Sequence, residues 1–413
     1  MSHFNVLVIG AGTAGIMVAS QLRKKGIENI ALIDPSEHHY YQPAWTLVGA
    51  GTYDFKKTER PMKSLMPSGV EWIKDSVENL NPKKNELTTK DGSNYTYDYL
   101  VVAPGLTYDF SMVEGLKEAL ERKIVCSNYT DPEETWIQIK NFKGGTALFT
   151  QPTTPIKCGG APQKIMYLAE SHFKKTGINS ATKIIFATNG GVIFGVKDIA
   201  KTLMNVVDRK DINLRFGHQL KKIDPEKKIA WYALGDNQSE YNHKEVTIHQ
   251  QDNLIGIEFD FLHTAPPSVA PKFVQNSELA NEGGWMKVST TTLQSPDFNN
   301  VFGLGDVAAL PTAKTGAAIR KQVPIVVDNI MKLMSSNSLG NKVYNGYSSC
   351  PLVTDYGKMV LAEFDYDNNF TPDPKLKQML IKDSSKEHWR LWMLKKYMLP
   401  YLYWNKMMKG ENV

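Results

Sequence analysis

The chain of 413 residues contains three cysteines, and two of them lie where a cysteine could do chemistry. Cys158 lies in "PTTPIKCGGAPQKIMYLAE" (152–170), a Pro- and Gly-rich turn between a predicted strand at 145–150 and a helix that should begin near Pro162. A cysteine near a helix N-terminus has a lowered pKa, so more of it is the reactive thiolate. Cys350 follows much later in "YSSCPLVTDY", and the sequence alone does not show whether the two meet. The alternative is a pair of buried, inert cysteines.

The N-terminal stretch "FNVLVIGAGTAGIMVASQLRKKGIENIALIDPSE" predicts a dinucleotide-binding unit. Residues 4–9 form an apolar run typical of a buried parallel strand. A second predicted strand at 30–33 ends in Asp34, whose carboxylate suits a ribose hydroxyl. The turn between strand and helix should hold the phosphates at the helix N-terminus. Its candidate binding residues are Gly10, Gly12, Thr13, Ala14 and Gly15.

Two later motifs favour FAD over NAD as the bound dinucleotide. "YDYLVVAPGL" (97–106) reads as a strand that ends with Ala103 and Gly105, and "NVFGLGDVAALP" (300–311) as a strand that ends in Gly-Asp. This layout resembles the flavoproteins with two dinucleotide-binding domains, the disulfide-reductase superfamily. The resemblance implies that Asp306 contacts the ribityl chain of FAD.

The middle of the chain repeats the strand–helix–strand outline over 183–215. The connecting turn is "NGGVIFGV" (189–196), in which Val192, Ile193 and Phe194 follow two adjacent glycines. Bulky side chains there would prevent the close backbone approach that a pyrophosphate needs. We therefore expect a domain that retained the fold and lacks a functional NAD(P)H site, with an unusual NADH site as the alternative.

These patterns predict an α/β fold of tandem Rossmann-like domains, related to the pyridine nucleotide-disulfide reductases, with a C-terminal amphipathic helical tail that anchors the protein to a membrane. The predicted boundaries are 1–109 for the first part of the FAD-binding domain, 110–264 for the second Rossmann-like domain, 265–335 for the second part of the FAD-binding domain, and 336–413 for a C-terminal region with Cys350 and the amphipathic helices.

The stretches around the two cysteines make the resemblance specific. "PIKCGGAPQKIMYLAE" and "SCPLVTDYGKMVLAEFDY" resemble sulfide:quinone oxidoreductases, in particular the branch that includes the mitochondrial enzymes, and "EHHYYQPAWTLVGAG", "PSGVEWIK" and "LPYLYWNKMM" extend the match. The resemblance implies that Cys158 and Cys350 form a redox disulfide beside FAD. Hydrosulfide would leave a persulfide on Cys350, and electrons would pass through FAD to ubiquinone or menaquinone. Glutathione, coenzyme A, sulfite or sulfide itself would accept the sulfur.

Several further residues have a supporting role by resemblance or by position. The resemblance places Gln42, Val77 and Lys314 beside FAD. Lys164 could stabilise a thiolate on Cys158 and Glu118 could carry a proton, although each could equally lie on a solvated helix face.

Cys126 and His263 are expected to have mainly structural roles. Cys126 has a catalytic role as its alternative, and we expect His263 to be hydrogen-bonded rather than catalytic. The nine histidines show no metal-ligand spacing, so no metal is predicted.

The segment 385–410 (the C-terminal tail) is rich in Trp, Tyr, Met and Lys. Pro400 should divide it into two short helices, and neither half could span a bilayer. A basic, aromatic, amphipathic pair suits the headgroup plane of a membrane. Packing on the core or a homodimer interface is the alternative. A quinone would enter beside the tail, with Phe364, Tyr356 and Lys395 as candidate contacts.

The composition limits the remaining function classes. A net charge of +5 without a basic aromatic run argues against nucleic-acid binding. No signal or transit peptide is recognisable, which predicts a peripheral protein on the cytoplasmic face of the cell membrane. The alternatives are a type-II NADH:quinone oxidoreductase, a soluble disulfide reductase, and a non-enzymatic flavin sensor or scaffold.

Overall fold

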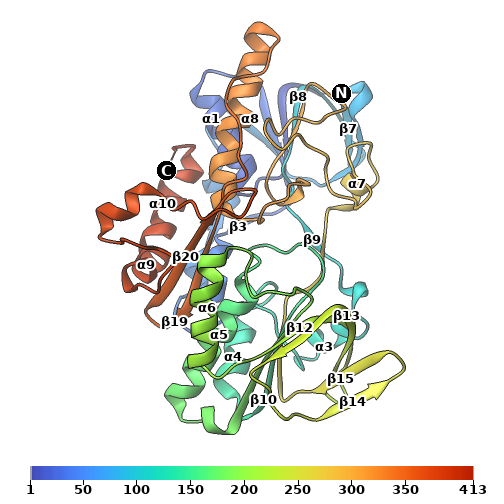
Figure 1. The fold of residues 1–413 in the computed structure, drawn as a ribbon. Coiled ribbons are helices and arrows are strands. Elements are labelled where there is room, and N and C mark those ends of the chain that lie inside the picture. Colours follow the sequence, from blue (N-terminus) through green and yellow to red (C-terminus); the bar gives the residue numbers. More distant parts are fainter. Residues whose placement is uncertain (1, 413) are drawn as a thin grey trace.

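The computed structural model describes residues 2–412, which form two α/β units and a C-terminal region (Figure 1). The first unit contains a seven-stranded sheet whose main path runs β5-β2-β1-β8-β7-β6, with β18 paired to β8. Its strands are β1 (Ser2–Ile9), β2 (Ile30–Ile33), β5 (Val70–Ile73), β6 (Val77–Asn81), β7 (Glu86–Thr89), β8 (Asn94–Val102) and β18 (Val301–Gly303). Strands β5, β2, β1, β8 and β18 run parallel to one another, whereas β7 is antiparallel to both of its neighbours, β8 and β6.

Two helices pack together beside this sheet, α1 (Thr13–Lys24) and α8 (Gly316–Ser336). Strand β2 and the second half of β1, from Val6 to Ile9, are wholly apolar and buried, as a parallel strand covered on both faces must be. Smaller elements complete the unit: β3 (His38–Tyr40), α2 (Trp45–Val48), β4 (Glu59–Pro61) and α7 (Lys272–Gln275).

The second unit contains another seven-stranded sheet, in the order β14-β15-β13-β12-β11-β10-β16. Its strands are β10 (Gly145–Gln151), β11 (Thr182–Thr188), β12 (Asn213–Asp224), β13 (Ile229–Tyr241), β14 (Ile248–Gln251), β15 (Leu254–Glu258) and β16 (Phe261–Thr264). Its helices are α3 (Leu116–Glu121), α4 (Pro132–Asn141), α5 (Ala161–Thr176) and α6 (Lys197–Arg209). The chain enters and leaves this unit through β9 (Thr107–Tyr108) and β17 (Ser268–Val269), which pair with each other close to the predicted boundaries.

The C-terminal region begins with an antiparallel hairpin, β19 (Ser348–Asp355) and β20 (Lys358–Phe364), and β19 packs against α5. The tail then forms α9 (Trp389–Met393), a π-helical turn (Leu394–Met398) and α10 (Leu399–Asn405). Pro400 lies just after the π turn, so the predicted break is a π turn that joins two short α-helices without interrupting the helical path.

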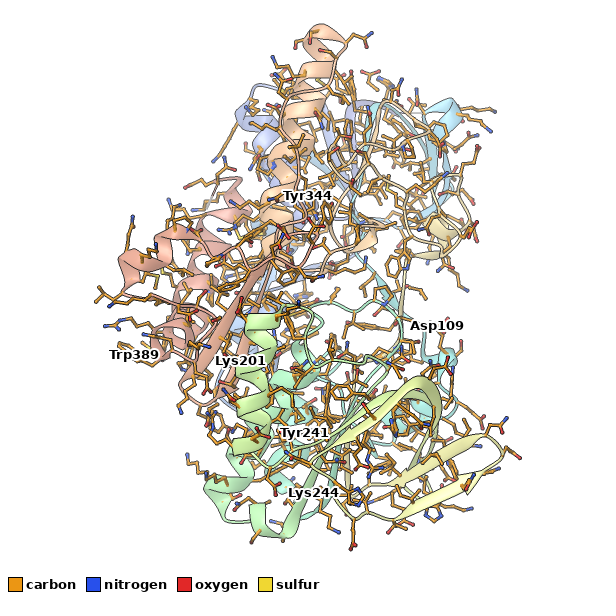
Figure 2. All side chains as sticks on the ribbon, viewed as in Figure 1. Asp109, Lys201, Tyr241, Lys244, Tyr344 and Trp389 are labelled. Atoms are coloured by element: carbon orange, nitrogen blue, oxygen red, sulfur yellow. The ribbon has the colours of Figure 1, made fainter. Side chains whose placement is uncertain are left out.

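The tail is two-sided. Its inner side is buried against the first unit: the Tyr403 hydroxyl lies 2.7 Å from Thr13 Oγ1, and Ser20 Oγ donates to the Met408 carbonyl at 3.3 Å. Its outer side exposes large apolar side chains, of which Trp389 is seen at the edge of the molecule in Figure 2. We call this set the outer stripe: Trp389, Met393, Tyr397, Met398 and Tyr401. The predicted alternative of packing on the core therefore describes one side of the tail, and the other side is free.

Candidate functional site

The structure brings together the two cysteines that the sequence left apart. Cys158 precedes α5 and Cys350 lies in β19, and their Sγ atoms are 3.5 Å apart. A disulfide bond is about 2.05 Å long, so these are two free thiols in contact, within reach of forming that bond. Gly160 makes room for this contact, because a Cβ atom there would lie 2.7 Å from Cys350 Sγ. Gly160 has no predicted role; its position two residues after Cys158 is the signal that could have found it.

The charge distribution divides the two thiols into a thiolate and a thiol. A hydrogen bond from Cys350 and the ammonium group of Lys164, whose Nζ is 2.9 Å from Cys158 Sγ, hold the pKa of Cys158 well below its usual range. The bond to Cys158, together with burial, holds the pKa of Cys350 well above it. Lys164 is buried, yet the neighbouring thiols more than offset the effect of burial and raise its pKa. The predicted stabilisation of Cys158 by Lys164 thus has a direct geometric basis.

The backbone of Cys158 has a φ of +49°, in the left-handed region that non-glycine residues rarely occupy. Such a conformation costs of order 1–3 kcal/mol and persists only where its surroundings hold it. Here the Cys158 N–H donates to the Lys314 carbonyl at 2.9 Å. The Cys158 carbonyl accepts from Ala161 N–H at 2.7 Å and from the Tyr129 hydroxyl at 3.4 Å. These bonds fix the direction in which Sγ points.

The turn between β1 and α1 is shaped to admit a dinucleotide. A Cβ atom on Gly15 would lie 1.8 Å from the Gly10 carbonyl, and Gly10 itself has a φ of +95°. By contrast, a Cβ on Gly12 would meet no atom within 4 Å, so space is open at the helix N-terminus. Asp34 accepts from Ala11 N–H at 2.7 Å, and burial raises the pKa of its carboxyl. Of the other predicted residues, Thr13 and Ala14 begin α1.

The predicted flavin-side residues converge on the segment that carries Cys158. Lys157 Nζ donates to Gln42 Oε1 at 3.0 Å and lies 3.9 Å from Asp306 Oδ2. Lys314 Nζ donates to the carbonyls of Asp306 and Ala308 and lies 4.1 Å above the Trp285 ring. Burial lowers the pKa of Lys314 to about 8. Lys157 was missed from the sequence, although it is adjacent to the cysteine.

Three more predicted cofactor residues lie in the first unit. Val77 is buried at the start of β6, and Ala103 follows β8, where its carbonyl packs against Gly10. Gly105 has a φ of +76°, and a Cβ there would meet no atom within 4 Å. Open glycine turns at both Gly12 and Gly105, with Asp306 nearby in the same unit, fit a bound FAD.

Comparisons with known proteins agree over almost the whole chain. The sequence profile described as "Pyridine nucleotide-disulphide oxidoreductase" matches residues 4–142. The chain is 41% identical over 412 residues to the mitochondrial sulfide:quinone oxidoreductase of Mus musculus, covering 99% of this chain and 87% of that protein. It is 40% identical to the enzyme of the same name from Dictyostelium discoideum, covering 98% and 86%. The chain belongs to the sulfide:quinone oxidoreductase family.

The fold agrees with this family. The crystal structure of the sulfide:quinone oxidoreductase of Aquifex aeolicus superposes with a TM-score of 0.76 at 20% identity, covering 100% of this chain and 92% of that one. The α/β pyridine nucleotide-disulfide oxidoreductase-like fold and the FAD cofactor are those of the family. The predicted placement on the cytoplasmic face of a cell membrane has no support from the curated relatives, which are named as mitochondrial. Within residues 2–412, no helix has the length and apolar character needed to cross a bilayer.

Three residues considered above for a supporting or catalytic role, Glu118, Cys126 and His263, lie away from the cysteine pair of this oxidoreductase. Glu118 lies on the exposed face of α3 and pairs with Arg122 at 2.8 Å, so it shows no contact with the thiols. Cys126 is buried, its thiol lies 3.7 Å from the Leu262 carbonyl, and burial raises its pKa far above the usual range. His263 is buried with Nε2 2.6 Å from Asn128 Oδ1, and burial lowers its pKa to about 3. These surroundings favour structural roles for Cys126 and His263.

Of the candidate quinone contacts, Phe364 packs against the "NGGVIFGV" turn, whereas Tyr356 lies at the tip of the β19–β20 hairpin. Phe364 meets the ring of Phe194 edge-on, with centroids 6.0 Å apart, and the Tyr356 hydroxyl donates to the Ala50 carbonyl at 3.1 Å. Ile193 is buried, and its carbonyl accepts from Gln163 at 2.6 Å.

Lys395 lies on the inner side of the tail and interacts with the cluster of Cys158, Cys350 and Lys164. It is buried, and its Nζ donates to the Pro43 carbonyl at 3.0 Å. Burial, and then the charge of Lys164, lower its pKa to about 7, while the thiols of Cys158 and Cys350 oppose that shift. Lys395 is therefore a second amine whose charge acts on the cysteine pair.

Proposed function

We propose that this protein oxidises sulfide at the Cys158–Cys350 pair and passes the electrons through FAD to a membrane quinone. The observation that carries the proposal is the pair itself: two free thiols 3.5 Å apart, with Lys164 Nζ at 2.9 Å from one of them. The adjacent residue, Lys157, connects the pair to Gln42 and Asp306 on the cofactor side. FAD, when bound, accepts an electron pair from the thiols and delivers it to a quinone.

The opposite pKa shifts assign a role to each sulfur. In thiol–disulfide exchange the thiol of lower pKa leaves faster. Hydrosulfide should therefore attack Cys350 Sγ of the disulfide, releasing its proton and forming a persulfide there. The Cys158–Cys350 bond breaks, and Cys158 leaves as a thiolate that Lys164 stabilises.

A small nucleophile then takes the outer sulfur from Cys350, which becomes a thiolate. When the two thiolates close to a disulfide again, two electrons leave the pair. Two sulfur–sulfur bonds span at most about 4.1 Å, so one extra sulfur atom also fits between Sγ atoms 3.5 Å apart. Thiols, sulfite and sulfide are all candidate acceptors, because each is a soft nucleophile.

The C-terminal tail supplies access to a lipid-soluble acceptor. The outer stripe is flanked by basic residues: Arg390 lies 4.7 Å above the Trp389 ring, and Lys396 lies 5.6 Å from the Tyr397 ring centroid. Exposed aromatic rings with neighbouring cations suit a helix that lies in the interface of a membrane. We propose peripheral attachment through this stripe, with the quinone reaching the flavin past Tyr356 and Phe364.

The decisive experiment follows the flavin absorbance of the purified holoenzyme without oxygen. Sulfide should bleach the flavin, NADH should not, and a short-chain quinone should restore the colour. Cys158→Ser and Cys350→Ser should each keep FAD and lose the response to sulfide. Cys126→Ser is the matched control and should keep it. Bleaching by NADH and not by sulfide would instead support a type-II NADH:quinone oxidoreductase and would overturn the proposal.

A further inference from the structure

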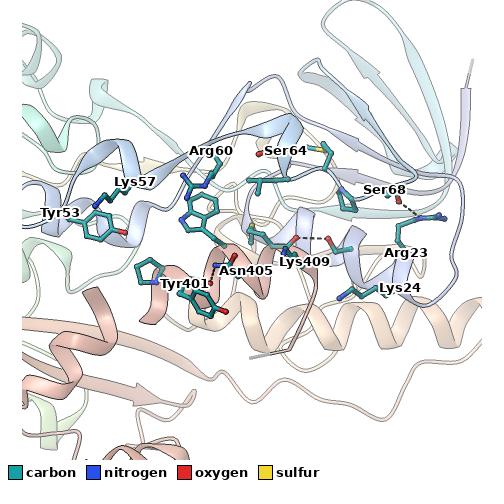
Figure 3. A pocket seen from close by; sticks show the side chains of 17 residues that line it. Arg23, Lys24, Tyr53, Lys57, Arg60, Ser64, Ser68, Tyr401, Asn405 and Lys409 are labelled. Carbon is teal, nitrogen blue, oxygen red and sulfur yellow. Dashed lines mark hydrogen bonds between the residues drawn. The ribbon is translucent and has the colours of Figure 1, made fainter. Parts of the chain in front are cut away.

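A cavity of about 1020 Å³ lies between α1, the loop at 53–68 and the end of the tail (Figure 3). It shares no lining residue with the cysteine pair or with the candidate quinone contacts. Five basic side chains line it, and no Asp or Glu is among its lining residues within the described chain. We call it the basic pocket, with the cations Arg23, Lys24, Lys57, Arg60 and Lys409.

The charge of the basic pocket is largely uncompensated. Within residues 2–412, none of its five cations forms an ion pair. Arg23 donates to the carbonyls of Ile27 and Ser68, and Arg60 lies 5.1 Å from the Trp404 ring centroid. Glu411, which pairs with Lys406 at 2.8 Å, also interacts electrostatically with Lys24 and Lys409. Like charges gathered without counter-charges destabilise a fold unless an anion binds there.

Part of the lining of the basic pocket is apolar, and one of its residues belongs to the outer stripe. Leu65, Met66 and Trp404 line its interior, and Tyr401 at its edge belongs to the outer stripe as well. A free phosphate would use the cations and leave these walls bare. A molecule with an anionic head and an apolar body would use both.

We propose that the basic pocket binds the headgroup of an anionic glycerophospholipid, whose acyl chains lie along the outer stripe. The phosphate would contact the lysine and arginine side chains, and the lipid would fix the depth and orientation of the tail in the membrane. This inference rests on the proposed membrane attachment and adds a preference for anionic lipid.

The test uses the purified holoenzyme and vesicles of phosphatidylcholine, either alone or mixed with phosphatidylglycerol. The wild type should bind the mixed vesicles more tightly. Lys24→Gln/Lys57→Gln/Lys409→Gln should lose roughly 100-fold in affinity for the mixed vesicles, since each charge near an anionic surface contributes about fivefold. Binding to phosphatidylcholine alone should change little.

A matched control removes three exposed lysines from the β12–β13 end of the second unit: Lys221→Gln/Lys227→Gln/Lys228→Gln. It should bind mixed vesicles like the wild type. Equal losses of vesicle affinity in both triple variants would show that only the net charge of the protein matters, and would overturn the proposal. Binding of the pocket variant with the wild-type affinity would also overturn it. Displacement from vesicles by inorganic phosphate alone, at constant ionic strength, would make the pocket a small-anion site and also overturn it.

The outcome is separable from the proposed activity. Both triple variants should reduce a soluble short-chain quinone with sulfide at the wild-type rate, because none of the six lysines touches the thiols or the cofactor turns. If sulfide fails to reduce the flavin in the wild type, the proposed activity fails while the vesicle results still decide the lipid site.

Discussion

Two turns join a parallel strand to a helix in the two α/β units, and they differ in what fills them. Between β1 and α1, a Cβ atom added to Gly12 would meet no other atom within 4 Å, so the space there is open. Between β11 and α6, Ile193 is buried and Phe194 packs edge-on against Phe364 of the C-terminal hairpin. The backbone plan is similar, and we propose that the side-chain volume of Ile193 and Phe194 keeps a dinucleotide away from the second turn.

The comparison shows how one fold can serve two purposes in the same chain. The first unit keeps its turn empty for a cofactor. The second unit uses the same region to hold the hairpin that carries Cys350, and it places Cys158 and Lys164 at the start of another helix, α5. The following changes test that division, beginning with the largest expected effect.

Gly15→Val should abolish FAD binding, because its Cβ would lie 1.8 Å from the Gly10 carbonyl. The ratio of flavin absorbance to protein absorbance measures this loss. Gly12→Val separates binding from folding, since its Cβ meets nothing within 4 Å. That variant should unfold cooperatively like the wild type and still lack flavin. A Gly12→Val protein with full flavin content would contradict the role of the first turn.

Lys164→Met should leave FAD content intact and slow flavin reduction by sulfide by about tenfold or more at neutral pH. The Lys164 ammonium lowers the pKa of Cys158, so its removal raises that pKa and makes Cys158 a poorer leaving group. The rate of the variant should recover as pH rises, because a larger fraction of Cys158 becomes thiolate. Stopped-flow rates between pH 6 and pH 9 check this, with Lys164→Arg as the charge-preserving control. An unchanged pH profile would remove Lys164 from the mechanism.

Phe194→Ala should lower the free energy of unfolding by about 2 kcal/mol, less than a fully buried Phe would cost, because the side chain is only half-buried against Phe364. Urea denaturation measures the change. The variant should gain no reactivity with NADH, since Ile193 still fills the turn. Flavin reduction by NADH in this variant would contradict the role of Ile193 and would show that Phe194 alone blocks the nucleotide.

Gly190→Ala should have the smallest effect, within about 0.5 kcal/mol. Its added Cβ would lie 3.6 Å from the Val192 carbonyl, an ordinary contact distance. Flavin content and sulfide activity should match the wild type. Set beside Gly15→Val, this variant measures how much the two glycine turns differ in function.

Local sequence patterns were sufficient to predict the elements of the fold that depend on neighbouring residues alone. The β1 strand, the glycine turn, Asp34 and the two tail helices follow from periodicity and from the conformational preferences of Gly and Pro. Bulky side chains in the turn at 189–196 can be seen in the sequence, and Ile193 is buried there while Val192 is exposed; the lack of an NAD(P)H site stays a prediction. The α/β fold with two sheets follows from the same signals.

The geometry of the site was beyond such patterns. That Cys158 meets Cys350 depends on packing between α5 and β19, which no local preference encodes. Packing between distant segments also determines the hydrogen bond from Lys157 to Gln42 and the close approach of Gly160 to Cys350. The resemblance to a family supplied the cysteine pair, whereas distances and charges had to come from the structure. The π turn before Pro400 likewise depends on how the tail packs against the first unit.

The discontinuous first unit has a consequence for synthesis. Its sheet needs β18, and the hydroxyl beside Thr13 in its cofactor turn comes from Tyr403 near the end of the chain. The second unit, in contrast, is continuous from β10 to β16. At about 5–20 residues per second, a ribosome needs roughly 15–60 s to pass from α1 to β18. During that interval the apolar face of α1 lacks α8 and the tail, so the half of the molecule that is translated first is completed last.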